Sequence, residues 1–132
     1  MTRAGTLVEN PYAWTRLANL VALEAPGGVG FSYCEAQKTG GHCAWDDKTT
    51  AAASANAIRD FFRKFPEVAA NPFFITGESY AGVYCPTLAA ELLGDVNLVG
   101  MAVGDPCTDN AAQKQSMDML WYLSLIHISE PT

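Results

Sequence analysis

The chain has 132 residues, of which 49% are hydrophobic and 17% charged, a balance typical of a folded globular domain and not of a disordered segment. Its formal net charge of −6 argues against a nucleic-acid-binding protein and against attachment to an anionic membrane surface. No apolar run approaches the roughly 18 residues of a membrane-spanning helix. The first residues lead into no apolar stretch, so we expect no secretory signal in this chain.

The first predicted element is the mostly apolar run Leu17–Leu23. It has the composition of a strand that is buried on both faces in a parallel sheet. Pro26, Gly27 and Gly28 follow it and predict a tight turn. A phosphate-binding loop would need a Lys and a Ser or Thr after the glycines, and a helix directly behind them. Neither is present, so we expect a simple turn.

Cys34 and Cys43 bracket a polar loop, and the residues alone leave three states open for them. A disulfide that closed so short a loop would stabilise it by constraining the unfolded chain. A zinc site with His42 would lack a convincing fourth ligand and the usual spacing of cysteine ligands. Free thiols are the third state. Cys85 lies in an apolar, helical setting and is expected to be buried, whereas Cys107 is free to pair outside this segment.

We predict no metal and no cofactor.

A helix is predicted to begin at Asp46 and Asp47, with Asp46 as its N-cap, and to end before Pro66. Its apolar residues recur at spacings of three and four, which places them on one face of the helix, toward the sheet. These residues are Ala51, Ala55, Ile58, Phe62 and Phe65.

The apolar run Phe73–Thr76 ends at Gly77, and small residues then surround a serine, Ser79. This pattern is typical of a strand that passes through a very tight turn into a helix. Ser79 is expected at the apex of the turn, in a strained conformation and with its hydroxyl exposed. Such a turn is the nucleophile elbow of an α/β-hydrolase. The alternative is a glycine-rich turn with a capping serine.

A helix over Tyr80–Leu93 follows, with Pro86 expected to kink or restart it and Gly94 expected to end it. A further buried strand is predicted over Asn97–Val103. A last helix, capped by Thr108 or Asp109, is expected to run through Tyr122. Strands that alternate with helices predict a parallel α/β sheet with flanking helices.

Three motifs together resemble the serine carboxypeptidase family, in its order and approximate spacing. They are Gly77-Glu78-Ser79-Tyr80-Ala81-Gly82, Asn10-Pro11-Tyr12-Ala13-Trp14 and Pro26-Gly27-Gly28-Val29-Gly30-Phe31-Ser32-Tyr33. The resemblance implies a partial α/β-hydrolase fold over residues 1–122, with a mostly parallel sheet. Residues 123–132 do not resemble the family, and we interpret them as a non-native tail.

The resemblance also implies roles for three residues. Ser79 matches the nucleophile, the backbone N–H of Tyr80 matches one oxyanion donor, and Glu78 matches the residue that binds the free C-terminal carboxylate of the substrate. The parent protein would then cleave the C-termini of peptides or proteins through an acyl-enzyme, without a cofactor. Neither nucleic acid nor membrane is expected as a partner, and the sequence does not determine an oligomeric state.

The rest of the catalytic machinery is expected outside this chain. The family's second oxyanion donor would precede residue 1, and its acid and histidine would follow the last residue, so we interpret the chain as an inactive central fragment. His42 precedes Ser79, against the order of the α/β-hydrolases, and no strand lies between Met117 and His127 to carry the second histidine. We therefore expect neither histidine to act as the base.

Two other functions remain open at this point. One is an acyltransferase of the same family, although such members tend to carry Asp at the position of Glu78, so Glu78 favours a peptidase. The other is a non-catalytic truncated product. The family resemblance further implies a parent protein of the secretory pathway, bound for the vacuole, the lysosome or the exterior. In that compartment Cys34 and Cys43 are expected to form a disulfide.

Overall fold

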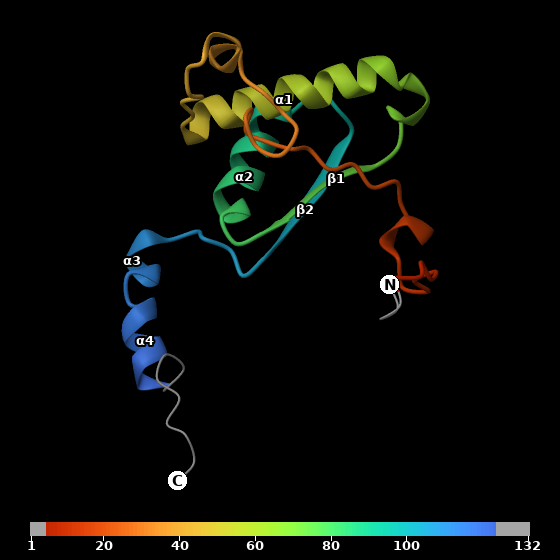
Figure 1. The fold of residues 1–132 in the computed structure, drawn as a ribbon. Coiled ribbons are helices and arrows are strands. Elements are labelled where there is room, and N and C mark those ends of the chain that lie inside the picture. The colour runs from red at the N-terminus through yellow and green to blue at the C-terminus, as the bar shows by residue number, and fades with distance from the viewer. Residues whose placement is uncertain (1–4, 124–132) are drawn as a thin grey trace.

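The computed structural model describes residues 5–123, which form one small β–α–β unit with helices around it (Figure 1). Strand β1 (Phe73–Glu78) and strand β2 (Leu98–Gly104) are parallel and are linked by helix α2 (Ala81–Leu92). Helix α1 (Asp47–Lys64) precedes β1, and the short helices α3 (Asn110–Gln113) and α4 (Ser116–Tyr122) follow β2. Single 3-10 turns lie at Trp14–Arg16, Glu35–Thr39 and Pro66–Val68. The predicted class, a parallel α/β sheet with flanking helices, is confirmed.

The two faces of the sheet differ in burial. Ile75 is buried on the face that the helices cover, whereas Phe74, Thr76 and Glu78 of the same strand are exposed on the opposite face. The buried core lies between α1, α2 and the covered face of the sheet, and its members are Ala55, Ile58, Ile75, Cys85 and Leu92. One face of this sheet therefore carries the whole core.

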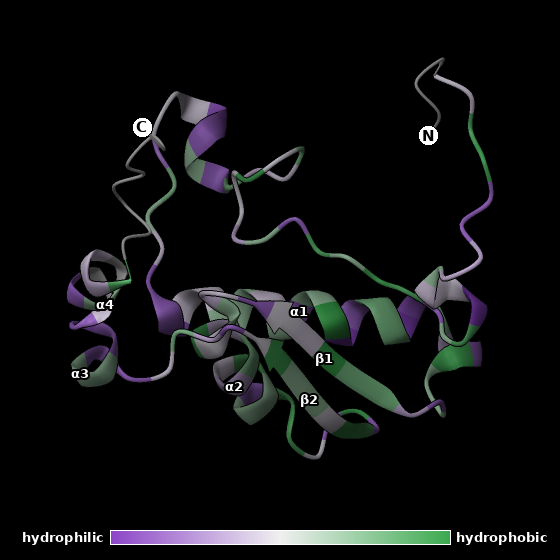
Figure 2. Cartoon of the chain, turned by 90° about the horizontal axis from the view of Figure 1, so that it is seen from below, coloured by the Kyte–Doolittle hydropathy of each residue, from purple (hydrophilic) through white to green (hydrophobic). Residues whose placement is uncertain are grey.

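Helix α1 begins and ends where the sequence predicts. The carboxylate of Asp46 accepts a hydrogen bond from Thr49 N at 2.7 Å and caps the helix. Figure 2 shows that apolar (green) and polar (purple) residues alternate along the helix. Ala51, Ala55 and Ile58 are buried, as predicted. Phe65 is 47% exposed instead, because it stands beyond the last helical residue with φ −124° and ψ 64°, where its side chain no longer follows the helix face.

Helix α2 runs through Pro86 without a break, so the predicted restart does not occur. The hydroxyl of Thr87 donates to Val83 O at 2.7 Å. Gly94 follows the helix with φ +84°, the left-handed conformation in which glycine commonly ends a helix.

The predicted C-terminal helix is divided into α3 and α4. The Asp109 side chain accepts from Ala111 N at 2.7 Å and caps α3, as one of the two predicted caps. The helix breaks at Lys114 and Gln115, and Gln115 has φ −90° and ψ 2°. Both short helices lie apart from the sheet (Figure 1). Without a packing partner a helix gains little from continuing, which accounts for the division.

The predicted buried strand Leu17–Leu23 is wrong for this structure. Its residues form no strand and are exposed, and Leu17 is 95% exposed. Together with α1 and β1 the segment lines an open cavity of about 1170 Å³. A strand requires a hydrogen-bonded neighbour, and among residues 5–123 the only paired strands are β1 and β2.

The expected non-native tail lies outside the described residues from position 124 onward, so the boundary expected after Tyr122 stays a prediction. No helix within residues 5–123 is both long enough and apolar enough to cross a membrane.

Candidate active site

Ser79 lies at the apex of the turn between β1 and α2, and its side chain is exposed. Its φ is +60°, in the left-handed region that L-residues other than glycine avoid at a cost of about 1–2 kcal/mol. The strained, exposed conformation expected for this serine is therefore present. The other non-glycine residue with positive φ among residues 5–123 is Asp105, with φ +40°, directly after β2. Strained residues of this kind often lie at functional sites.

Backbone hydrogen bonds hold Ser79 in this conformation. Ser79 N donates to Gly104 O at 3.0 Å, and Ser79 O accepts from Gly82 N at 3.0 Å and from Cys107 N at 2.9 Å. The turn is thus tied to the end of β2, to the segment after β2 and to the first turn of α2. In contrast, the N–H of Tyr80 donates to no acceptor among the residues that the structure describes.

The small residues around Ser79 are required by close contacts. A Cβ on Gly77 would lie 2.3 Å from Ala81 Cβ, and a Cβ on Gly82 would lie 2.5 Å from Cys107 O. Both distances are too short for any side chain. The small residues are therefore explained by two close approaches: Gly77 lies against the first turn of α2, and Gly82 lies against the segment after β2.

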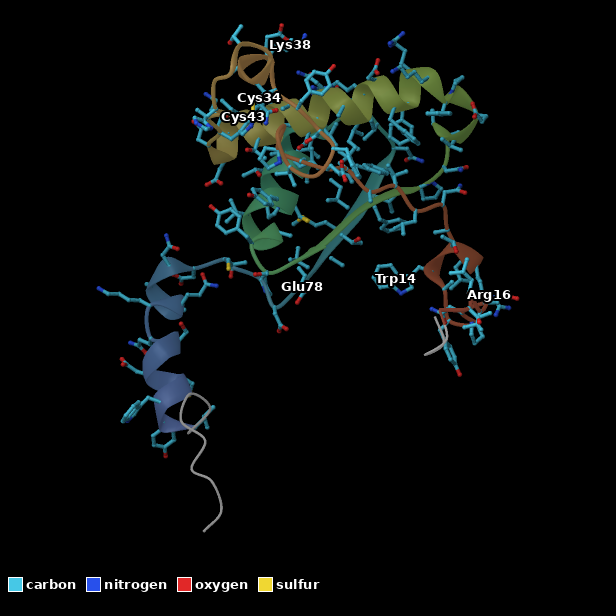
Figure 3. All side chains as sticks on the ribbon, in the orientation of Figure 1. Trp14, Arg16, Cys34, Lys38, Cys43 and Glu78 are labelled. Carbon is cyan, nitrogen blue, oxygen red and sulfur yellow. A yellow bond between two sulfur atoms is a disulfide. The ribbon has the colours of Figure 1, made fainter. Side chains whose placement is uncertain are left out.

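Glu78 is the last residue of β1, opposite Gly104 of β2, and its carboxylate is exposed at the carboxyl end of the strands (Figure 3). This end of a parallel sheet is where ligands bind in open α/β folds. A cavity of about 540 Å³ lies beside it. Its lining consists of Trp14, Thr76, Gly77, Ala102, Val103 and Gly104. Trp14, 74% exposed, approaches the sheet from the N-terminal segment.

The side chain of Tyr80 extends to the start of α1. Its hydroxyl donates to the Asp47 carboxylate at 3.0 Å, and its ring meets the ring of Tyr84 edge to face, with centroids 4.9 Å apart. The hydrogen bond to Asp47 is the main cause that raises the pKa of Tyr80 above its ordinary value. Sequence reasoning missed this contact, because no local pattern links residues that are 33 positions apart.

No catalytic base is brought to Ser79 within residues 5–123. The Ser79 hydroxyl has no hydrogen-bond partner in that range, and His42 is exposed in the loop before α1. His127 lies outside the described residues. Among the described residues there is also no group of three or more side chains that could hold a metal ion. The site therefore presents a serine, a backbone donor and a carboxylate.

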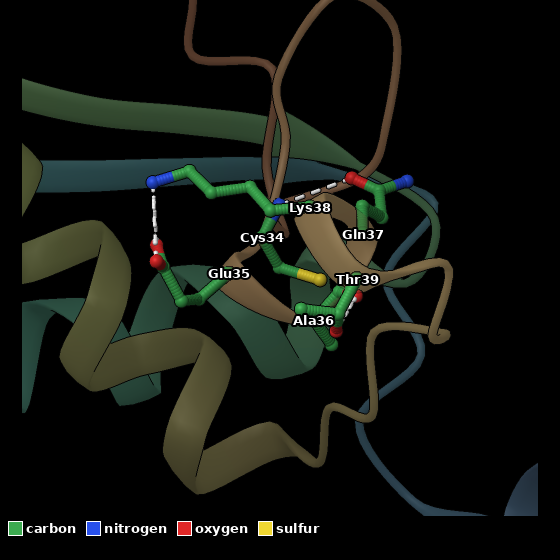
Figure 4. A network of polar contacts seen from close by, with 6 residues as sticks. All are labelled: Cys34, Glu35, Ala36, Gln37, Lys38 and Thr39. Carbon is green, nitrogen blue, oxygen red and sulfur yellow. Dashed lines mark hydrogen bonds and ion pairs between the residues drawn. The ribbon is translucent and has the colours of Figure 1, made fainter.

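Cys34 and Cys43 form a disulfide, with their Cα atoms 5.9 Å apart. The loop that it closes is braced internally (Figure 4): Cys34 N donates to Gln37 Oε1 at 3.1 Å, and Lys38 pairs with Glu35 at 2.9 Å. Sulfur atoms bonded to each other cannot hold zinc, so the zinc alternative does not apply to this state. Cys85 and Cys107 are free thiols, and burial raises the pKa of Cys85.

The glycine-rich turn packs directly on the disulfide loop. A Cβ on Gly28 would lie 2.9 Å from Cys43 Sγ, and Trp45 Nε1 donates to Gly27 O at 2.7 Å. The Glu24 carboxylate accepts from Phe31 N at 2.6 Å across the same turn. These side-chain contacts were not predicted. The acid before the glycines was the one available signal, since carboxylates often accept from turn amides.

Comparison with known proteins gives a consistent result. The family model described as serine carboxypeptidase matches residues 1–131. The chain is 43% identical over 124 residues to the lysosomal protective protein of Mus musculus, covering 92% of this chain and 25% of that protein. It is 42% identical over 108 residues to serine carboxypeptidase-like 21 of Arabidopsis thaliana, covering 76% of this chain and 21% of that protein. Serine carboxypeptidase ctsa-4.1 of Caenorhabditis elegans is 44% identical over 100 residues, covering 73% of this chain and 20% of that protein. The chain thus spans about a quarter of the length of the curated relatives it matches.

Proposed function

This chain belongs to the serine carboxypeptidase family, and on that premise we propose that its parent protein removes C-terminal residues from peptides through an acyl-enzyme on Ser79. In the first step Ser79 Oγ bonds to the carbonyl carbon of the last peptide bond, and the C–N bond breaks to release the terminal residue. In the second step water attacks the ester, which releases the shortened peptide and restores the serine. The first step needs a base that accepts the hydroxyl proton and passes it to the leaving amine, and in the second step the same base moves a proton from water to the serine.

The observation that carries this proposal is the conformation of Ser79. Its φ of +60° exposes the side chain at the carboxyl end of β1, ahead of the first turn of α2. The N–H of the next residue, Tyr80, is unpaired among the described residues and is therefore open to an oxyanion at the carbonyl under attack. A capping serine in an ordinary turn needs neither of these features.

We assign recognition of the substrate's C-terminal carboxylate to Glu78, which is exposed next to Ser79. Two carboxylates repel each other when both are charged, but a neutral carboxyl donates a hydrogen bond to the other. Hydrolysis of a peptide with a free C-terminus should therefore decline as the pH rises. The C-terminal amide of the same peptide carries no such charge and should be hydrolysed at higher pH with less decline.

A labelling experiment tests the nucleophile. The full-length parent protein is treated with a fluorophosphonate probe, and its hydrolysis of an N-blocked dipeptide is measured. We expect labelling at Ser79 and hydrolysis of the dipeptide, both absent in Ser79→Ala. We expect the 132-residue chain alone to show neither, since the base, the acid and the second oxyanion donor of the family are expected outside it. Labelling elsewhere, or turnover that survives in Ser79→Ala, would contradict the assignment.

The role of Glu78 is tested by kcat/KM as a function of pH, for a peptide with a free carboxylate and for its amide. Gln at this position keeps a hydrogen-bond donor but does not ionise, so Glu78→Gln should flatten the decline on the free peptide. Identical pH profiles for wild type and Glu78→Gln on that peptide would remove Glu78 from this role.

We further propose that the parent protein passes through the secretory pathway. This is supported by the disulfide between Cys34 and Cys43, a bond that persists in oxidising compartments, and by the name of the lysosomal relative. Peptide mapping of the unreduced full-length protein is expected to recover the two cysteines in one linked fragment. Alkylation of both thiols without reduction would argue against the bond and against this compartment.

A further inference from the structure

We propose that Asp47 is a positioning residue for the reaction at Ser79, acting through the hydrogen bond that it accepts from the hydroxyl of Tyr80. The inference rests on the proposed function, because it assigns to Asp47 a part in the reaction of that same serine. It concerns a residue of α1, 32 positions before the nucleophile in the sequence. The contact exists only because α1 and α2 pack against each other.

The contacts of the Tyr80 side chain restrict the backbone of the turn. Tyr80 directly follows Ser79, precedes the first residue of α2, and carries the N–H that is proposed above as an oxyanion donor. Its ring is held on one side by Tyr84, with centroids 4.9 Å apart, and at its tip by Asp47 Oδ1 at 3.0 Å. Because χ1 joins the ring to the backbone, a ring held at both places restricts the orientation of the Tyr80 N–H.

The strained backbone of Ser79 must be held by its surroundings, and the Tyr80–Asp47 bond is one of the contacts that can hold it. A residue with φ +60° relaxes toward ordinary conformations unless its surroundings hold it. Among the described residues, the Tyr80–Asp47 bond is the side-chain hydrogen bond that ties residues 77–82 to α1. Its loss would leave Ser79 and its neighbouring N–H held by backbone contacts to α2 and to the region after β2.

The simpler explanation is that Asp47 only stabilises the start of α1 as an acidic residue near the positive end of the helix dipole. The chain provides a matched control for this, since the neighbouring Asp46 caps the same helix through Thr49 N, whereas the Tyr80 hydroxyl donates to Asp47. Removal of either carboxylate weakens the start of α1. Only the removal of Asp47 breaks the bond to Tyr80.

The test uses the full-length enzyme and the variants Asp47→Ala, Asp47→Asn, Tyr80→Phe and Asp46→Ala. We expect Asp47→Ala and Tyr80→Phe each to lower kcat and the rate of fluorophosphonate labelling by about tenfold with little change in KM, since misplacement at a catalytic centre costs this much or more. Asp47→Asn should retain most of the activity, because its amide oxygen still accepts the bond. The double variant Asp47→Ala/Tyr80→Phe should be no slower than either single variant, because both remove the same interaction. Asp46→Ala should lower the thermal midpoint and leave kcat within about twofold of wild type.

A second readout does not depend on activity. The phenol of Tyr80 is faced by Asp47, Tyr84 and Cys107, and its pKa is raised. NMR titration of Tyr80 should show this pKa fall toward the ordinary value in Asp47→Ala, because no side chain at position 47 then accepts a hydrogen bond from the phenol. The fall should be smaller in Asp47→Asn, whose amide oxygen still accepts that bond. Should Asp47→Ala fail to fold, Tyr80→Phe still removes the bond through the loss of one oxygen atom.

The outcomes separate this inference from the proposed function. If the wild-type enzyme is not labelled at Ser79, the proposed function fails and the positioning role fails with it, whatever the titration shows. If Ser79 is labelled but the Asp47 and Tyr80 variants react at the wild-type rate, only the positioning role is overturned. Additive losses in the double variant, or a loss in Asp46→Ala equal to that in Asp47→Ala, would also overturn it.

Discussion

At the scale of single residues, Ser79 combines a backbone strain with an exposed hydroxyl. Its φ of +60° is held by three backbone hydrogen bonds, which involve Gly82, Gly104 and Cys107. Such strain is tolerated only where the surroundings over-determine the conformation. A capping serine would gain nothing from it, whereas a nucleophile gains access to a substrate above the end of the sheet.

The strain at Ser79 predicts that glycine is more stable than alanine at this position, the reverse of the usual order. Replacement of Ser79 by Gly, which adopts positive φ freely, should leave the full-length protein more stable than Ser79→Ala by about 1 kcal/mol. Urea denaturation measures the difference. Ser54, in the middle of α1, is the matched control. There Gly should be less stable than Ala by about 1 kcal/mol, because glycine is unfavourable within a helix. If the Gly variant were less stable than the Ala variant at both positions, Ser79 would not be strained.

At the scale of elements, α1 is held by a cap at its start and, farther along, by hydrogen bonds to the end of α2. Its start is capped by Asp46, and the hydrogen bonds from the backbone N–H and the hydroxyl of Thr49 lower the pKa of that carboxyl below its ordinary value. Farther along, the Arg59 guanidinium donates to Asp95 Oδ2 at 2.7 Å and to Glu91 O at 2.6 Å. The arginine therefore joins α1 to the C-terminal end of α2, and the two helices act as one layer over the sheet.

The Asp46 cap predicts that the stability of the folded protein decreases at acidic pH. Because the pKa of Asp46 is lower in the folded protein, its stabilising effect is complete above the ordinary value of about 4 and is lost as the pH falls through the lowered pKa. Asn keeps the accepting oxygen without the charge, so Asp46→Asn should lose less stability on acidification. Thermal midpoints of the full-length protein at about pH 6 and about pH 3 measure this. Equal losses in both proteins would contradict it.

The bridge between the helices predicts that Arg59 is not replaceable by lysine. A lysine carries one compact ammonium group and cannot donate to Asp95 and Glu91 with the same fork, so Arg59→Lys should cost about 1 kcal/mol in urea denaturation. Arg63 provides the control, since it is 73% exposed and pairs with Asp60 of its own helix. Arg63→Lys should change the stability little, because an exposed pair within a helix contributes little. Equal costs for the two variants would argue against the bridge.

At the scale of the whole molecule, the chain exposes far more surface than a self-contained domain. Its accessible surface is 10662 Å² for a mass of 14.2 kDa. A compact monomer of this mass exposes about 6,800 Å², so about 3,900 Å² is in excess. The exposed side chains include Phe31 at 97%, Leu17 at 95% and Phe74 at 57%. Within residues 5–123, each of the two strands pairs along one edge only.

This surface predicts how the isolated chain behaves. With a core of only a few buried side chains, the 132-residue chain should bind the dye ANS, self-associate as its concentration rises, and unfold over a broad range of urea without a sharp transition. Fluorescence, sedimentation and circular dichroism measure the three properties. A monomer that unfolds cooperatively and binds no dye would show that the excess surface is tolerated.

The sequence by itself determined the local features of this protein. The apolar run before Gly77, the close approach of Gly77 to Ala81, the Asp46 cap and Gly94 each depend on contacts within a few residues, so the β1–α2–β2 unit and α1 were predictable. Leu17–Leu23 was predicted as a strand from its composition, but a strand also needs a neighbour at its edge, and composition carries no information about that neighbour.

Only the tertiary structure decided which distant residues meet. The hydroxyl of Tyr80 reaches Asp47, Arg59 reaches Asp95, and Gly82 packs on the backbone of Cys107. These pairs are far apart in the sequence, and each forms because helices and strands pack at a particular distance and angle. The spacing of residues along one chain does not encode that geometry. The strained turn at Ser79 was therefore predictable from its neighbours, whereas the residues proposed to hold it in place were not.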